Sequence, residues 1–348
     1  MDKQKVKAII YALLAAVFYA VNVPVSKLLL REVGPAAMAA LLYLGAGIGI
    51  GAMSLLGRSD KEKREKLSKE DLPFVIGMIV LDIAAPIFLM LGISHGSAAN
   101  ASLLGNFEIV ATTVIALFIF KEAVSARLWI AIALITVSSA LLSFEGTESL
   151  RFSYGSLYVL AATVCWGFEN NCTRNISSKD TYEIVVLKGI FSGIGSLIIA
   201  FIKRETVPGF LYIAASLLLG FVAYGLSIFL YVRAQNVIGA AKTSAYYAIA
   251  PFVGAFLSFV FLREKLSWIY LAALAVMIAG SVLVAADTII RHHEHMHQHS
   301  FTHTHDGFTH THTVTHTHGH DHYVTDGKHG HHHSAEELEK LPGAKHAG

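Results

Sequence analysis

The sequence predicts an all-α polytopic membrane protein, with ten transmembrane helices arranged as two inverted five-helix repeats and a disordered His-rich C-terminal tail. Of the 348 residues, 54% are apolar and only 15% are charged. A soluble domain carries about 25% charged residues, so this composition is typical of a membrane protein. The 27 basic and 25 acidic residues nearly balance, which argues against a nucleic-acid-binding protein. Two cysteines are too few for a secreted disulfide framework.

Ten apolar runs are long enough to cross a membrane. A spanning helix needs about 20 mostly apolar residues, because the hydrocarbon core is about 30 Å thick. The runs do not alternate between apolar and polar residues, so barrel strands are not expected. The expected spans are 8–28, 35–57, 73–93, 98–119, 127–144, 155–173, 184–202, 209–230, 240–262 and 267–287.

Basic residues set the expected orientation. The stretch from Arg58 to Lys69 holds six basic residues, and the positive-inside rule places it in the cytoplasm. The N-terminus is then cytoplasmic, and an even number of spans returns the C-terminus to the same side. We therefore expect an integral protein of a bacterial or archaeal cell membrane with both termini in the cytoplasm.

An internal repeat divides the membrane part. Residues 120–125 (Phe-Lys-Glu-Ala-Val-Ser) match residues 262–267 (Leu-Arg-Glu-Lys-Leu-Ser), and the same offset sets Ala98 and Ala99 on Ala240 and Ala241. Because five helices per repeat is an odd number, the repeats must insert in opposite directions, as in secondary transporters. The expected units are residues 8–144, residues 153–287 and the tail, residues 288–348.

These features carry a resemblance to a known family. The segment from Phe18 to Pro24 in the first span, and the Lys121-Glu122 and Arg263-Glu264 motifs after the fourth and ninth spans, resemble EamA-type transporters of the drug/metabolite transporter superfamily. The resemblance covers residues 8–287. It implies an alternating-access carrier of a small organic solute, often an exporter, without implying which solute.

Ionisable residues inside spans are costly, so each needs a reason. Asp82 and Glu108 each lie about 15 Å into their expected helices, near the middle of the membrane. Thr112 shares a helical face with Glu108. Such carboxyls could exchange a proton between the two sides of the membrane, or they could be hydrogen-bonded to a neighbouring helix only to fix packing.

A second polar group is expected nearer the cytoplasmic face. Glu169 and Asn170 end the sixth span, Lys188 lies about one turn inside the seventh, and Lys242 begins the ninth. Glu169 and Lys188 have similar depths on antiparallel helices, so an ion pair that closes an inward gate is a hypothesis. Alternatively, the two lysines reach the interface by snorkelling and the asparagine caps its helix.

Three further residues are candidate contacts for a solute. Asn22 is a candidate hydrogen-bond donor in the first span. Tyr246 and Tyr247 precede Pro251 and could stack on a solute or simply pack. Prolines within spans, Pro24 among them, can kink a helix and expose carbonyl groups.

The histidine content of the tail predicts that it binds metal ions. It contains 17 histidines between residues 292 and 333, many in His-x-His steps. Imidazole suits Zn and Ni, and a segment this poor in apolar residues should be disordered. The alternative is a low-complexity extension with no transport role. The candidate ligands are His292, His293, His295, His297, His299, His303, His305, His310, His312, His316, His318, His320 and His322.

The tail supports a rival hypothesis, a Zn or Ni exporter with a cytosolic collecting or sensing arm. Against it, His95 is the one histidine before the tail, and transition metals prefer nitrogen or sulfur ligands over carboxylates such as Asp82 and Glu108. An enzyme is not expected, because the spans hold no nucleophile–base motif and no Gly-rich phosphate loop. No cofactor is required, and the expected partners are lipid, a small solute and divalent metal ions, without nucleic acid.

Overall fold

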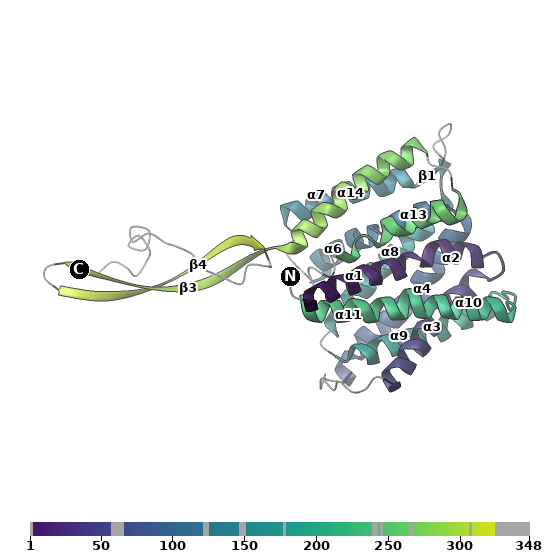
Figure 1. Ribbon diagram of the computed structural model, residues 1–348, viewed down its shortest axis with the longest axis horizontal. Helices are drawn as coiled ribbons and strands as arrows, with labels where there is room; N and C mark the ends of the chain where they lie inside the picture. The colour runs from purple at the N-terminus through teal and green to yellow at the C-terminus, as the bar shows by residue number, and fades with distance from the viewer. Residues whose placement is uncertain are drawn as a thin grey trace. The chain divides into compact units, whose positions relative to one another are not determined.

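The computed structural model describes residues 3–56, 66–120, 125–145, 151–176, 179–238, 243, 246–264, 267–305 and 308–323. The chain forms two compact units, Met1–Ala285 and Ala286–Gly348, and each is described by itself (Figure 1).

The first unit is a bundle of helices. Before the short bridge of β1 (Phe144–Glu145) with β2 (Arg151–Phe152), the helices are α1 (Lys3–Ala20), α2 (Asn22–Leu29), α3 (Pro35–Leu56), α4 (Leu72–His95, preceded by the 3-10 turn η1, Lys69–Asp71), α5 (Ala98–Leu104), α6 (Phe107–Phe120) and α7 (Ala126–Leu142). After the bridge they are α8 (Tyr154–Asn175), α9 (Thr181–Ile202), α10 (Phe210–Gly220), the π-helical segment η2 (Phe221–Leu226), α11 (Ser227–Ile238), α13 (Ala250–Leu262) and α14 (Trp268–Ile289).

The helices confirm a polytopic all-α membrane protein. Within the described residues, seven helical stretches are long and apolar enough to cross a membrane: Lys3–Leu29, Pro35–Leu55, Lys69–His95, Ala98–Ile119, Tyr182–Ile202, Phe210–Ala234 and Trp268–Asp287. Two shorter apolar helices are Ala126–Leu142 and Ala250–Leu262. Helix α8 has 22 residues but is more polar, because its last turns carry Glu169, Arg174 and several asparagines.

Several expected spans are interrupted rather than continuous. The first breaks between α1 and α2 at Val21, because Pro24 has no N–H for the carbonyl of Ala20. Helix α13 approaches that carbonyl, since a Cβ added at Gly254 would lie 3.2 Å from it. The fourth breaks at Gly105, a residue that weakens helices.

Small residues let helix backbones approach closely. Helix α3 packs against α9 and α10. A Cβ added at Gly45 would lie 2.1 Å from the carbonyl oxygen of Leu217, and one added at Gly220 would lie 2.1 Å from that of Leu42. Gly45 and Gly220 therefore serve helix contact, as expected for small residues in membrane helices.

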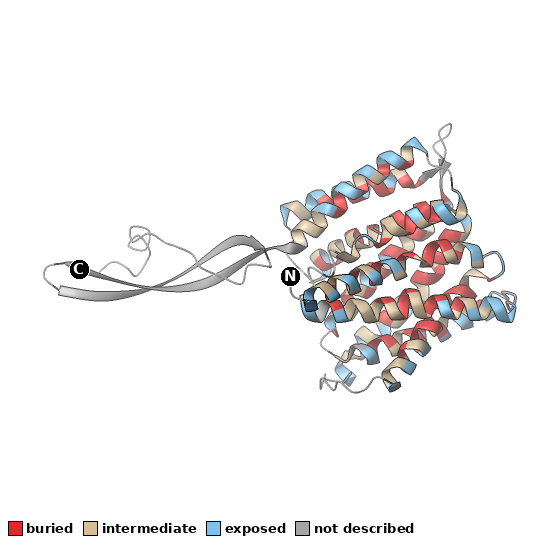
Figure 2. Cartoon of the chain, viewed as in Figure 1, coloured by how far each residue is buried: buried red, intermediate tan, exposed pale blue. Residues whose placement is uncertain are grey.

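The pattern of buried and exposed residues is the one expected of a helix bundle whose outer surface contacts lipid. Buried residues gather on the faces that the helices turn toward one another, and exposed residues lie on the other faces (Figure 2). Many large apolar residues are among the exposed ones. Phe118, Phe201 and Trp268 are 75%, 71% and 83% exposed. A soluble protein rarely exposes so much apolar surface.

The second unit differs from the expected disordered tail. Its described backbone forms β3 (Ile290–His305) and β4 (Phe308–Tyr323), two antiparallel strands in which His295 pairs with His318. The many threonines, a β-branched residue type, favour paired extended backbone. The shortage of apolar residues favours disorder, whereas this preference favours paired strands.

Candidate functional site

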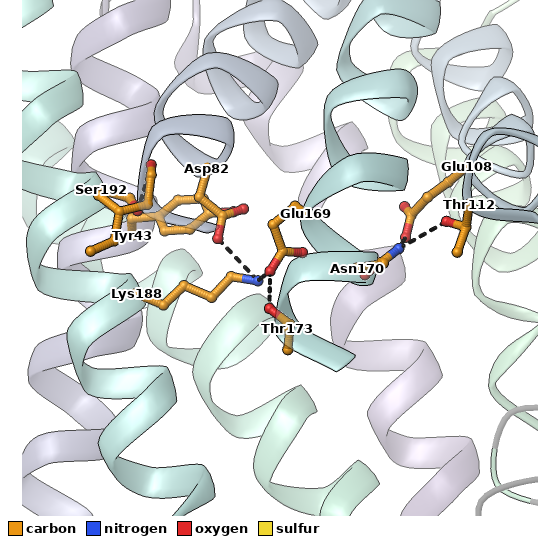
Figure 3. A network of polar contacts seen from close by, with 10 residues as sticks. Tyr43, Asp82, Glu108, Thr112, Glu169, Asn170, Thr173, Lys188 and Ser192 are labelled. Carbon is orange, nitrogen blue, oxygen red and sulfur yellow. Dashed lines mark hydrogen bonds and ion pairs between the residues drawn. The ribbon is translucent and has the colours of Figure 1, made fainter. Parts of the chain in front are cut away.

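An ion triad joins three helices inside the bundle. The Nζ of Lys188 on α9 lies 3.0 Å from Oδ2 of Asp82 on α4 and 3.0 Å from Oε1 of Glu169 on α8 (Figure 3). Asp82 is 0% exposed and Glu169 is 2% exposed. The side chain of Lys188 retains 20% exposure. Such charges persist in a membrane interior only when they are paired, and one ammonium here serves two carboxylates.

Neighbouring hydroxyls complete the triad. The hydroxyl of Tyr43 on α3 donates to Oδ1 of Asp82 at 2.8 Å, and Thr173, one turn after Glu169, donates to Oε1 of Glu169. Pro86 follows Asp82 by one turn of α4. Because proline has no N–H, the backbone carbonyl of Asp82 lacks its usual helical donor.

A second polar cluster lies on the other side of α8. The amide of Asn170 donates to Oε1 of Glu108 at 2.7 Å and to the hydroxyl of Thr112 at 3.2 Å. Consecutive residues of a helix point about 100° apart. Glu169 can therefore face the triad while Asn170 faces α6, as Figure 3 shows. Helix α8 thus links the two clusters.

A tyrosine cluster adjoins the triad. The rings of Tyr43 and Tyr224 have centroids 5.4 Å apart, and Tyr19 lies 5.9 Å from both Tyr224 and Tyr247. The amide of Asn22 donates to the hydroxyl of Tyr224 at 3.1 Å. Tyr224 lies in η2, and π-helical turns occur frequently at functional sites. The cluster joins α1 and α3 to segments that follow β2.

The structure brings together six of the residues that the sequence singled out, in two groups: Asp82, Glu169 and Lys188, and Glu108, Thr112 and Asn170. The ion pair hypothesised between Glu169 and Lys188 is present. The alternatives given for Lys188 and Asn170 are not what the structure shows. Lys188 does not snorkel, because it is paired with two carboxylates. Asn170 does not cap its helix, because α8 continues to Asn175.

One depth is also corrected. Asp82 and Lys188, expected at different depths, are in contact. Glu108 keeps its expected position near the middle of the Ala98–Ile119 stretch, but the helix breaks just before it, so it lies in the first turn of α6.

The remaining candidates are dispersed. Asn22 and Tyr247 belong to the tyrosine cluster, whereas Tyr246 makes none of the ring contacts found among the described residues. Lys242 lies outside the described residues. For the tail histidines named above, the structure describes the backbone of the two strands only.

Sequence reasoning missed Tyr43, Tyr224 and Thr173. Aromatic residues in apolar runs are usually packing residues, and nothing in their spacing marks these two. For Thr173 a signal existed, since it follows Glu169 by four residues and such pairs are neighbours on a helix.

Glu264 fastens the start of one helix to the end of another. Its carboxylate accepts hydrogen bonds from the hydroxyl of Ser97 at 2.7 Å and from the N–H groups of Ala98 and Ala99 at 2.8 and 3.0 Å. Glu264 thereby caps α5, because exposed N–H groups at a helix start favour a carboxylate.

Glu205 makes an equivalent contact. Its carboxylate accepts from the N–H groups of Ala36 and Ala37 at the start of α3, at 3.1 and 2.8 Å. Gly34 makes room for it, since a Cβ there would lie 2.3 Å from the carboxylate. Each of these glutamates follows β2 and binds a helix that precedes β1.

No metal ligand set accompanies these clusters. Within the described residues, no three or more His, Cys, Asp or Glu side chains are grouped so that they could hold a metal ion. What the site offers is charge, amide and hydroxyl groups beside aromatic rings. That chemistry suits reversible binding of a small polar molecule.

A family model and one relative both indicate a transporter, and a solved structure shares the fold. The sequence model of the EamA-like transporter family matches residues 6–144 and again residues 153–286. An uncharacterized transporter of Methanothermobacter thermautotrophicus is 22% identical over 284 residues, covering 76% of this chain and 82% of the relative. A solved crystal structure shares the fold at a TM-score of 0.59 and 16% identity, covering 79% of this chain and 94% of the other.

Proposed function

This chain belongs to the EamA-like transporter family, and on that premise we propose that it exports a small metabolite by alternating access. The solute is amino-acid-like or a similar organic molecule. The carrier consists of two inverted five-helix repeats, residues 8–144 and 153–287, with both termini in the cytoplasm of a bacterial or archaeal cell. The solute binds between the repeats, at the triad and the clusters beside it.

The helices available are consistent with this arrangement. Among the described residues, our proposal takes as its ten crossings the seven long apolar helices, the shorter Ala126–Leu142 and Ala250–Leu262, and the polar α8. Five of these precede β1 and five follow β2. An odd number in each repeat inverts the second relative to the first.

The observation that carries the proposal is the triad of Lys188, Asp82 and Glu169. Each charged residue in mid-membrane costs at least about 2.5–3.5 kcal/mol on insertion scales, so a bundle held together for stability alone has little reason to keep three. Because Lys188 divides its charge between two carboxylates, a solute or a proton can displace one contact while the other remains. In our proposal, that exchange opens the inward gate, and a proton taken up by one of the carboxyls couples transport to the proton gradient.

Glu264 and Glu205 serve as the opposing gate in this proposal. Each joins the end of a helix after β2 to the start of a helix before β1. These contacts keep that end of the bundle closed while the triad end admits solute. They would release when the bundle opens toward the other side.

We assign the tail a separate role in metal binding. The strand register pairs His293 with His320, His295 with His318 and His297 with His316, and directly opposite residues have Cβ atoms about 5 Å apart. The full chain should therefore take up Zn or Ni, and a full-length variant with the tail histidines replaced by asparagine should not. Equilibrium dialysis measures the difference. Equal uptake by both chains would place metal binding elsewhere.

The first test of transport is a solute screen on the purified full-length protein. A molecule that binds the folded state raises its melting temperature by mass action. A stabilising solute is then loaded into proteoliposomes, and its exchange with external labelled solute is followed. Exchange that is lost in Lys188→Met and kept in Lys203→Met, an exposed lysine just after the same helix, supports the proposal. Exchange that Lys188→Met leaves intact contradicts it.

A further inference from the structure

The charges at the site do not balance. Three carboxylates, those of Asp82, Glu108 and Glu169, meet one described ammonium, that of Lys188. Lys188 is engaged by Asp82 and Glu169. Within the described residues Glu108 has no ion-pair partner, and its one hydrogen-bond donor is the neutral amide of Asn170. Glu108 is therefore the carboxylate of the site whose charge is least compensated.

Glu108 also acts electrostatically on the tyrosine cluster. Its carboxylate is within electrostatic range of the hydroxyls of Tyr19, Tyr224 and Tyr247. The ring centroid of Tyr19 lies 5.9 Å from that of Tyr224 and 5.9 Å from that of Tyr247. A negative group beside aromatic faces is the combination that recognises an organic cation, because the ring faces also attract positive charge.

On the basis of the proposed transport function, we infer that the solute is an organic amine, whose ammonium binds Glu108 and whose apolar body packs on Tyr19, Tyr224 and Tyr247. Helix α8 positions this subsite, since Asn170 holds the Glu108 carboxylate from one side. Thr112, which receives the second hydrogen bond from the same amide, supplies a hydroxyl next to it.

The surroundings select against other ligands. An anion would meet an unpaired carboxylate. A divalent metal ion needs several oxygen ligands, whereas the other two carboxylates here already hold Lys188. A neutral solute brings no charge to pair with Glu108, so the buried carboxyl would hold a proton instead of forming an ion pair with the solute. An ammonium supplies the missing charge and donates hydrogen bonds to Glu108.

Four related molecules test the charge preference on the full-length protein in detergent: phenethylamine, the permanent cation phenyltrimethylammonium, the neutral 2-phenylethanol and the anionic 3-phenylpropionate. Binding is measured by calorimetry. We expect both cations to bind, and the neutral and anionic molecules to bind more weakly by about tenfold or more. Equal or tighter binding of the neutral or anionic molecule overturns the inference, as does the absence of binding by all four.

Variants test the residue. Glu108→Gln should weaken phenethylamine binding by about tenfold or more, and Glu108→Asp should keep the preference for cations at reduced affinity. Glu32→Gln, at an exposed position between α2 and α3, is the matched control and should change nothing. If Glu108→Gln binds phenethylamine as the unmodified protein does, the subsite is not Glu108. Should Glu108→Gln fail to fold, the Glu108→Asp result decides.

The transport proposal is tested separately by labelling Thr112→Cys from each side of the membrane, which requires no ligand. Two-sided labelling together with no preference for cations removes the amine inference alone. One-sided labelling removes the transport proposal as well.

Discussion

Lys188 and Asp82 face each other across α9 and α4 at 3.0 Å, with the Asp82 side chain fully buried. The Asp82 carboxylate has no access to water there, whereas the Lys188 side chain retains 20% exposure. The contact makes the bundle depend on Lys188 in a way that a surface ion pair would not, because exposed pairs contribute only about 0–1 kcal/mol.

Replacing Lys188 by methionine should destabilise the protein strongly. The change leaves Asp82 and Glu169 buried without a counter-ion, and removing one partner of a buried ion pair costs about 3–5 kcal/mol. Thermal unfolding in detergent measures the loss. Adding Glu169→Gln to Lys188→Met should restore part of it, because one unpaired charge is then removed.

The control is Lys203→Met, an exposed lysine at the end of the same helix. It should unfold at the temperature of the unmodified protein. If Lys188→Met and Lys203→Met unfold alike, the triad contributes nothing to stability.

The crossing of α3 and α10 should not tolerate a methyl group. A Cβ at Gly45 would lie 2.1 Å from a backbone oxygen of Leu217, so Gly45→Ala must push the two helices apart. We expect the free energy of unfolding to fall by about 1–3 kcal/mol or more, as at other overpacked sites. Gly51→Ala lies on the same helix, where the nearest atom to the added Cβ is a methyl of Val186 at 3.9 Å. That variant should be neutral by the same unfolding assay, and a loss equal to that of Gly45→Ala would disprove the close approach.

Tyr43→Phe should destabilise the triad while leaving the ring cluster in place. The change removes the hydroxyl that donates to Oδ1 of Asp82 at 2.8 Å. A hydrogen bond to a charged group contributes about 1.5–3 kcal/mol. Tyr154→Phe, at a side chain that is 78% exposed, should have no effect in the same denaturation series. Identical stability of Tyr43→Phe and the unmodified protein would mean that Asp82 does not need this donor.

Glu264→Gln should loosen the end of the bundle that Glu264 fastens. Loss of the charged acceptor should weaken the cap on α5 by about 1–2 kcal/mol. The fraction of molecules in which this end of the bundle is open then rises roughly 5- to 30-fold. The readout is the rate at which a membrane-impermeant maleimide labels Ala101→Cys, a position that is 3% exposed, in a background where Cys165 and Cys172 are serine. Glu32→Gln in that background should label slowly. Equal rates for the two variants would exclude Glu264 as a gate contact.

The spans follow from composition and run length, and depth arguments also predict the pair of Glu169 and Lys188. The depth arguments fail for Asp82 because α9 begins at Thr181 and not at residue 184. At this helix start, Asp180 accepts a hydrogen bond from the N–H of Tyr182. Three residues add about 4.5 Å of helix. Lys188 therefore lies deeper than the apolar run suggests, at the level of Asp82.

Other features depend on contacts that no local pattern encodes. Glu264 resembles a turn residue because Ser267 follows it, and Ser267 does accept from the N–H of Tyr270 at 3.1 Å. The carboxylate of Glu264 nevertheless binds the start of α5, more than 160 residues away in the sequence. The position of Glu108 in a first helical turn depends on the break at Gly105, and a single glycine in an apolar run does not by itself predict a break.

In alternating access, one site is reached from each side of the membrane in turn. The most direct measurement is the labelling of Thr112→Cys, in the background without native cysteines, by an impermeant maleimide applied to right-side-out and then to inside-out vesicles. Alternating access predicts labelling from both sides, with Ala101→Cys labelled from one side only. Labelling of Thr112→Cys from a single side, or from neither, would contradict transport through this site.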